Sequence, residues 1–173
     1  MLVIGCGNRE RGDDGVGVLV AQCLRRQGTN ALVYEGDPLG LLDLWSVADE
    51  VLLVDAVVTG APAGTVHLWS AGEPWLAEAT PVSSHGFDLT QALKLAKTLH
   101  RLPANIRICG IEGVEFAPGA PMSSPVQQSA EAVVSWLLSP LDSHGHSLQS
   151  ERGNIAEHAR DGPYLPNASG TSK

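Results

Sequence analysis

Three side chains in this sequence carry groups suited to acid–base catalysis or metal binding: Asp14, Asp55 and His85. Asp14 follows a short apolar segment and a glycine-rich turn, and Asp55 comes directly after an apolar run. His85 precedes a segment with helical periodicity. Two carboxylates and an imidazole form an oxygen–oxygen–nitrogen set that suits a borderline divalent metal. The same groups would also suit general acid–base chemistry.

The expected order of strands and helices explains why these three residues should meet. Apolar segments typical of strands cover residues 1–4, 31–34, 51–54, 65–69 and 105–111. Segments with helical periodicity cover residues 15–27, 37–48, 88–101 and 124–138. Strands that alternate with helices predict a mainly parallel sheet with helices on both faces. Since the carboxyl ends of parallel strands share one edge of the sheet, distant loops converge there.

Each candidate also has a purely structural interpretation. Asp13 or Asp14 would cap the helix that follows. Asp55 is harder to explain in this way, because a carboxylate after four apolar strand residues is costly unless it is solvated or paired. His85, beside Gly86, would be an ordinary loop histidine. The functional hypothesis therefore rests on the joint placement of the three residues.

The turn after the first strand does not fit a dinucleotide loop. Gly5 and Gly7 lack the third glycine of the G-x-G-x-x-G pattern, because Glu10 stands in its place. Cys6 would be a nucleophile with His85, or a small packing residue at the end of a strand. The nucleotide-binding interpretation is therefore disfavoured, and a cysteine nucleophile stays an alternative.

Further acidic and capping residues follow the last expected strand and the second. Glu112 and Glu115 would line the same sheet edge or face water. Ser124 and Gln127 have the spacing of a capping box. Asp37, followed by proline, is expected to begin the second helix.

The composition is that of an ordinary globular protein. The 173 residues most simply form one folded domain over 1–138, followed by a flexible tail over 139–173 that is rich in small and polar residues. A net charge of −8 argues against nucleic-acid binding. No apolar run approaches the roughly 20 residues of a membrane helix, and no signal peptide is recognisable. Three widely spaced cysteines form no zinc pattern, so we expect a reduced cytoplasmic protein.

The order and spacing of several short motifs resemble those of the hydrogenase maturation endopeptidases, which complete the large subunit of nickel–iron hydrogenases. The motifs are Gly5-Cys6-Gly7-Asn8, Asp13-Asp14-Gly15-Val16-Gly17, Glu35-Gly36-Asp37, Val54-Asp55-Ala56 and Ser84-His85. The resemblance implies a three-layer α/β/α sandwich around a mostly parallel, roughly five-stranded twisted sheet. It also implies an endopeptidase that removes a C-terminal extension from the nickel-loaded precursor of the large subunit.

The same resemblance implies roles for individual residues. Asp14, Asp55 and His85 match the metal-contacting positions of the family and are the expected catalytic and metal-binding residues. Four further residues match motif positions that would support the site: Asn8, Asp13, Glu35 and Asp37. Gly86 stands where many family members carry a larger or polar residue, a difference that would alter substrate fit.

The hypothesis requires no permanent cofactor. Asp14, Asp55 and His85 would engage nickel already seated in the precursor, so that metal insertion licenses cleavage. The metal would polarise the scissile carbonyl or activate a water molecule, or one of the carboxylates would act as the base. The expected partner is the large-subunit precursor, with no nucleic acid and no membrane insertion, and nothing requires more than a monomer.

Two other function classes are alternatives. A phosphorylase-like or nucleotide-processing α/β enzyme would use the glycine turn for phosphate. The paired acids and the lack of a lysine or arginine at P-loop spacing argue against it. A non-catalytic hydrogenase-assembly chaperone would bind the metallated partner without shortening it.

Overall fold

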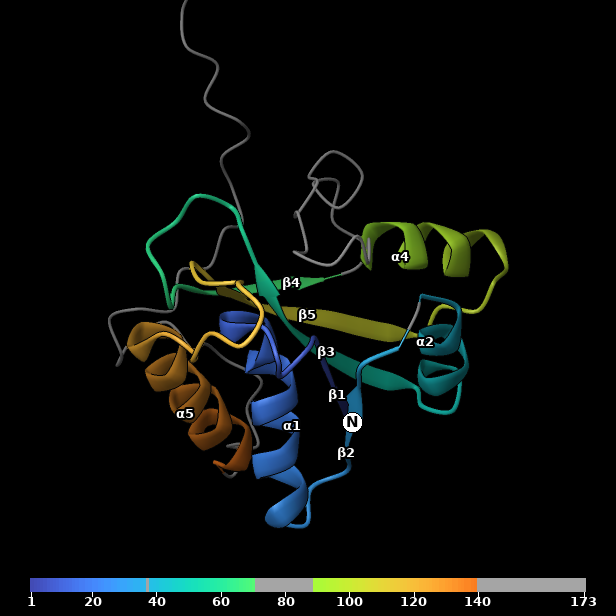
Figure 1. Ribbon diagram of the computed structural model, residues 1–173. Helices are drawn as coiled ribbons and strands as arrows, with labels where there is room; N and C mark the ends of the chain where they lie inside the picture. Colours follow the sequence, from blue (N-terminus) through green and yellow to red (C-terminus); the bar gives the residue numbers. More distant parts are fainter. Residues whose placement is uncertain (37, 71–88, 140–173) are drawn as a thin grey trace, which may run out of the picture.

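The computed structural model describes residues 1–36, 38–70 and 89–139 of the chain. Within these residues, a five-stranded sheet runs in the order β2-β1-β3-β5-β4 (Figure 1). The strands are β1 (Leu2–Cys6), β2 (Ala31–Tyr34), β3 (Glu50–Val57), β4 (Val66–Ser70) and β5 (Asn105–Glu112). β2, β1, β3 and β5 are parallel, whereas β4 is antiparallel to β5. The mostly parallel five-stranded sheet predicted from the sequence is confirmed.

Helices cover both faces of this sheet. They are α1 (Val16–Arg26), α2 (Pro38–Trp45), α4 (Leu89–Thr98) and α5 (Ser124–Leu138), and a 3₁₀ turn, η1 (Gly12–Gly15), precedes α1. α1 and α5 pack on one face, and α2 and α4 pack on the other (Figure 1). The arrangement confirms the predicted three-layer sandwich. No helix within the described ranges is long and apolar enough to span a bilayer.

Two cores result from the alternation of side chains along the strands. On β3, Leu53 joins the core beneath α2 and α4, while Leu52 and Val54 join the core beneath α1 and α5. Successive residues of a strand point to opposite faces. Asp55 therefore shares its face with Leu53 and Val57, the face covered by α2 and α4.

Two glycines let α1 lie unusually close to the sheet. A Cβ atom on Gly17 would overlap the carbonyl oxygens of Val54 and Cys6. A Cβ atom on Gly5 would overlap the carbonyl oxygen of Gly17 itself. The start of α1 is thus seated against β1 and β3, and η1 is held directly above the carboxyl end of β1.

Two local expectations from the sequence are wrong. Asp55 lies inside β3 rather than after it, because the ladder with β5 continues until Val57 pairs with Glu112. The capping box of Ser124 and Gln127 does not form. The N-cap of α5 is Ser123, whose hydroxyl is directed to a distant carboxylate instead of the helix.

Other sequence predictions fall on parts of the chain that are not described. The helix start at Asp37, the histidine at position 85 and the helix start at Asp88 all lie outside the described residues. The predicted tail lies outside them from residue 140 onward.

Candidate active site

Asp14 is placed by a tight turn that follows β1. Gly7 has a φ of 122°, which favours glycine, and a Cβ atom there would overlap the carbonyl oxygen of Asp14. The Asn8 N–H lies 3.0 Å from Asp14 Oδ2 and 3.2 Å from the Asp14 carbonyl oxygen, and donates to both. The Asn8 side chain stabilises the turn, since its Oδ1 accepts the Glu10 N–H at 2.8 Å. Asp14 is only 2% exposed, so the turn delivers a carboxylate that is almost fully withdrawn from water.

Asp55 is the second buried carboxylate of this region. Its Oδ1 accepts the Ala56 N–H at 2.8 Å, and the residue is 5% exposed. Burial and then the negative charge of Asp14 raise the pKa of Asp55 from 3.8 to about 7. A Cβ atom on Gly7 would lie 3.7 Å from Asp55 Oδ1, so this glycine keeps the space beside the carboxylate open. The structure therefore brings Asp14 and Asp55 together, as the strand order predicted.

Cys6 is not suited to act as a nucleophile here. The residue is 4% exposed at the carboxyl end of β1. Burial and the nearby charge of Asp55 both raise the pKa of the Cys6 thiol. A reactive cysteine needs an environment that favours the thiolate, and this one favours the thiol. The cysteine alternative therefore loses its chemical basis.

The third residue of the expected set, His85, lies outside the described residues, as does Asp37. α4 begins at Leu89 and packs on the sheet face that carries Asp55. Among the residues that the structure describes, no three histidine, cysteine or acidic side chains are grouped closely enough to hold a metal ion. The structure thus places two of the three candidates.

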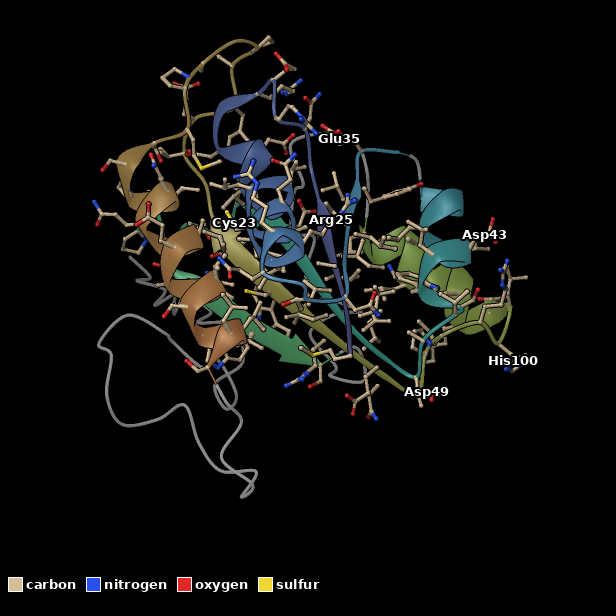
Figure 2. The ribbon with its side chains drawn as sticks, turned by 90° about the horizontal axis from the view of Figure 1, so that it is seen from below. Cys23, Arg25, Glu35, Asp43, Asp49 and His100 are labelled. Atoms are coloured by element: carbon tan, nitrogen blue, oxygen red, sulfur yellow. The ribbon has the colours of Figure 1, made fainter. Side chains whose placement is uncertain are left out.

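Glu35 lies at the surface, where the chain leaves β2 (Figure 2). Both of its carboxylate oxygens accept hydrogen bonds from Arg9, from Nε at 3.3 Å and from Nη2 at 3.1 Å. Arg9 and Glu35 belong to the loops after β1 and β2, which are neighbours in the sheet. This bidentate pair links the two loops beside the buried acids.

Asp13 does not cap the helix that follows, and that alternative is wrong. Its carboxylate accepts the backbone N–H groups of Val114, Glu115 and Ser123, together with the Ser123 hydroxyl. Although burial raises the pKa of Asp13, these donors outweigh it and hold the pKa below its ordinary value. Asp13 therefore connects η1 to the segment between β5 and α5.

Glu112 is buried rather than facing water, which corrects one of the two expectations for it. The residue is 2% exposed and accepts the N–H groups of Thr59 and Gly60 at 2.7 and 2.8 Å. The Thr59 hydroxyl donates to its other oxygen at 2.9 Å. Its Oε2 also lies 3.4 Å from His67 Nε2. Glu112 therefore holds the start of the β3–β4 connection.

Sequence reasoning missed His67. Its ring stacks on Trp69, with ring centroids 5.0 Å apart and planes 2° from parallel. His67 pairs with Gly110, which also pairs with Asp55 on the other side, so the three residues form one row across the sheet. A signal for it was present in the sequence. Side chains alternate along a strand, so His67 and Trp69, two positions apart, lie on the same face.

We expect Glu112→Gln to destabilise the fold by about 2–4 kcal/mol, because an amide cannot accept all the hydrogen bonds that the buried carboxylate accepts. Chemical denaturation measures the change. Arg101→Ala is the control, since it breaks an exposed ion pair with Asp43 and should change stability by only about 0.5 kcal/mol. Equal effects of the two substitutions would contradict a holding role for Glu112.

Comparison with known proteins decides the family. The sequence model of the hydrogenase maturation protease family, HycI, matches residues 36–140, more than half of the chain. The chain belongs to the hydrogenase maturation protease family. Members of this family act on the precursor of the hydrogenase large subunit, so the protein is a peptidase of hydrogenase maturation.

Individual members of the family are similar over most of the chain. Hydrogenase expression/formation protein HupD of Thiocapsa roseopersicina is 27% identical over 176 aligned positions, which cover 98% of this chain and 78% of HupD. The [NiFe] hydrogenase maturation protease HybD of Thermococcus kodakarensis has a TM-score of 0.66 at 25% identity, and the match covers 79% of this chain and 95% of that one. HybD of Escherichia coli shares the fold, with a TM-score of 0.65 at 19% identity, over 79% of this chain and 88% of that one.

The family assignment also bears on the other function classes. A phosphorylase-like or nucleotide-processing enzyme is not favoured, because the relatives are maturation proteases. A chaperone without peptidase activity is not favoured for the same reason. The maturation protease function predicted from the motifs is confirmed.

Proposed function

We propose that the protein removes a C-terminal extension from the large-subunit precursor of a nickel–iron hydrogenase, and that Asp14, Asp55 and His85 contact the nickel that the precursor carries. The cleavage is metal-assisted: the nickel polarises the scissile carbonyl or activates the attacking water. The protease needs no metal of its own, since the ion belongs to its substrate.

The observation that carries this proposal is the buried pair of acids. Asp14 and Asp55 are 2% and 5% exposed, and the charge of Asp14 helps to raise the pKa of Asp55. A site that holds two carboxylates so far from water gains stability when a cation arrives between them. Nickel in the precursor would favour the ionised form of Asp55, whereas a precursor without nickel would not. Metal insertion therefore becomes the signal that lets the precursor bind productively.

The test compares nickel-loaded with nickel-free precursor, each mixed with the purified protein. Mass spectrometry should show loss of the C-terminal extension from the nickel-loaded form alone. Arg101→Ala, altered at an exposed ion pair, serves as a control and should process the precursor like the wild type. Equal shortening of both forms would refute nickel licensing. Binding without shortening of either would instead support a chaperone.

A further inference from the structure

We propose that Asp13 is a positioning residue for Asp14: it fastens η1 to the segment of residues 113–123, and so fixes where the Asp14 carboxylate lies. This inference rests on the proposed function, in which Asp14 contacts the nickel of the precursor. Asp13 itself touches neither substrate nor metal in this scheme. It acts only through the backbone that it shares with its neighbour.

The hydrogen bonds of Asp13 are unusually complete for one side chain. Its Oδ2 accepts the N–H groups of Val114 and Glu115, both at 2.9 Å, and the Ser123 hydroxyl at 3.0 Å. Its Oδ1 accepts the Ser123 N–H at 2.6 Å. The Asp13 N–H in turn donates to the Glu115 carbonyl oxygen at 2.7 Å. Asp13 is 0% exposed, and both of its carboxylate oxygens are hydrogen-bonded to this segment.

Further contacts extend along the same segment. The Gly119 N–H donates to the Glu10 carbonyl oxygen at 2.7 Å, ahead of η1. Gly12 has a φ of 56°, and a Cβ atom there would lie 2.5 Å from the Glu115 carbonyl oxygen. A Cβ atom on Gly113 would lie 3.1 Å from that of Asp13. Segment 113–123 therefore lies against the outer side of the turn over much of its length.

Asp14 is held from two sides as a result. On the inner side, the Asn8 N–H donates to its carboxylate and to its carbonyl oxygen. On the outer side, Asp13, the residue that precedes Asp14, is hydrogen-bonded to Ser123, the N-cap of α5. Because Asp13 and Asp14 share a peptide bond, movement of the first displaces the second. A misplacement of about 1 Å at a reacting centre lowers a rate by about 100-fold.

Three variants test the inference with the full chain and nickel-loaded precursor. Asp13→Asn offers one acceptor oxygen instead of two, and Ser123→Ala removes only the hydroxyl donor. Val133→Ala is the matched control, because it removes buried methyl groups from α5 well along the helix from Ser123. Rates are measured at a temperature at which circular dichroism shows that all variants are folded. The melting temperature of each variant measures its loss of stability.

We expect kcat to fall by about 100-fold in Asp13→Asn and by about 3–10-fold in Ser123→Ala, with KM within about 3-fold of the wild type. Val133→Ala should keep the wild-type kcat although its melting temperature falls. If Asp13→Asn cleaves as fast as Val133→Ala, the positioning role is refuted. If Asp13→Asn does not fold, an unchanged kcat in Ser123→Ala refutes it equally. A wild-type protein that leaves the precursor intact would refute the proposed function instead.

Discussion

Asparagine in place of Asp55 is expected to abolish precursor cleavage and yet to stabilise the folded protein at about pH 8. The amide has the shape of the carboxylate and still offers an oxygen to the Ala56 N–H. It carries no charge, however, and so neither repels Asp14 nor attracts a cation. The two effects have one physical cause, the burial of a second negative charge beside the first.

The sign of the stability change follows from the pKa of Asp55. Burial and then the charge of Asp14 raise this pKa from 3.8 to about 7. Between these values the folded state holds a proton that the unfolded state has released, so stability falls as the pH rises. The loss is complete above about pH 7 and amounts to as much as about 4 kcal/mol, at about 1.4 kcal/mol per pKa unit. Asp55→Asn removes this loss.

Urea denaturation of both proteins at about pH 5 and about pH 8 measures the effect. The variant should gain stability relative to the wild type mainly at the higher pH. Asp43→Asn, which alters an exposed carboxylate on α2 (Figure 2), should leave the pH dependence almost unchanged. A variant that still cleaves the precursor, or that is less stable at about pH 8, would contradict the assignment of Asp55.

Gly17→Ala is expected to destabilise the protein by about 3 kcal/mol or more and to disrupt the site. The added methyl group would overlap the backbone oxygens of Val54 and Cys6, which cannot move aside without breaking the sheet. α1 must therefore shift outward. Because α1 follows η1 directly, the shift would carry Asp14 with it.

Thermal denaturation and precursor cleavage measure these two consequences. Gly28→Ala is the control: its φ is 77°, and apart from residue 28 and its chain neighbours no atom lies within 4 Å of the added Cβ. That variant bears only the strain of a left-handed backbone, about 1–2 kcal/mol, and should keep its activity. Equal stability losses in the two variants would show that close packing of α1 is not required.

The sequence was sufficient to predict the order of elements and both helical layers. Hydrophobic periodicity reports which face of each segment is buried, and that information is local. The antiparallel direction of β4 could not be predicted, because a strand has the same residue pattern in either direction. The position of Asp55 inside β3 was missed for a related reason. The strand continues past a charged residue because Ala56 and Val57 keep pairing with β5.

The site was predictable only in part. Asp14 and Asp55 were expected to meet because both lie at the carboxyl edge of a parallel sheet. The hydrogen-bond partners of Asp13 and Glu112 were not predictable, because most of their donors are backbone N–H groups of distant loops. Such groups are present at every residue except proline and leave no mark in a sequence.

Asp13 can form its hydrogen bonds to Ser123 only late in the synthesis of the chain. These two hydrogen-bonded residues are 110 positions apart. At about 5–20 residues per second, the ribosome needs roughly 5–20 s to add the residues between them. A nascent chain therefore carries its acids long before the segment that holds them exists. A product of interrupted translation that ends before Ser123 would lack the donors that Asp13 uses, and we expect it to be inactive.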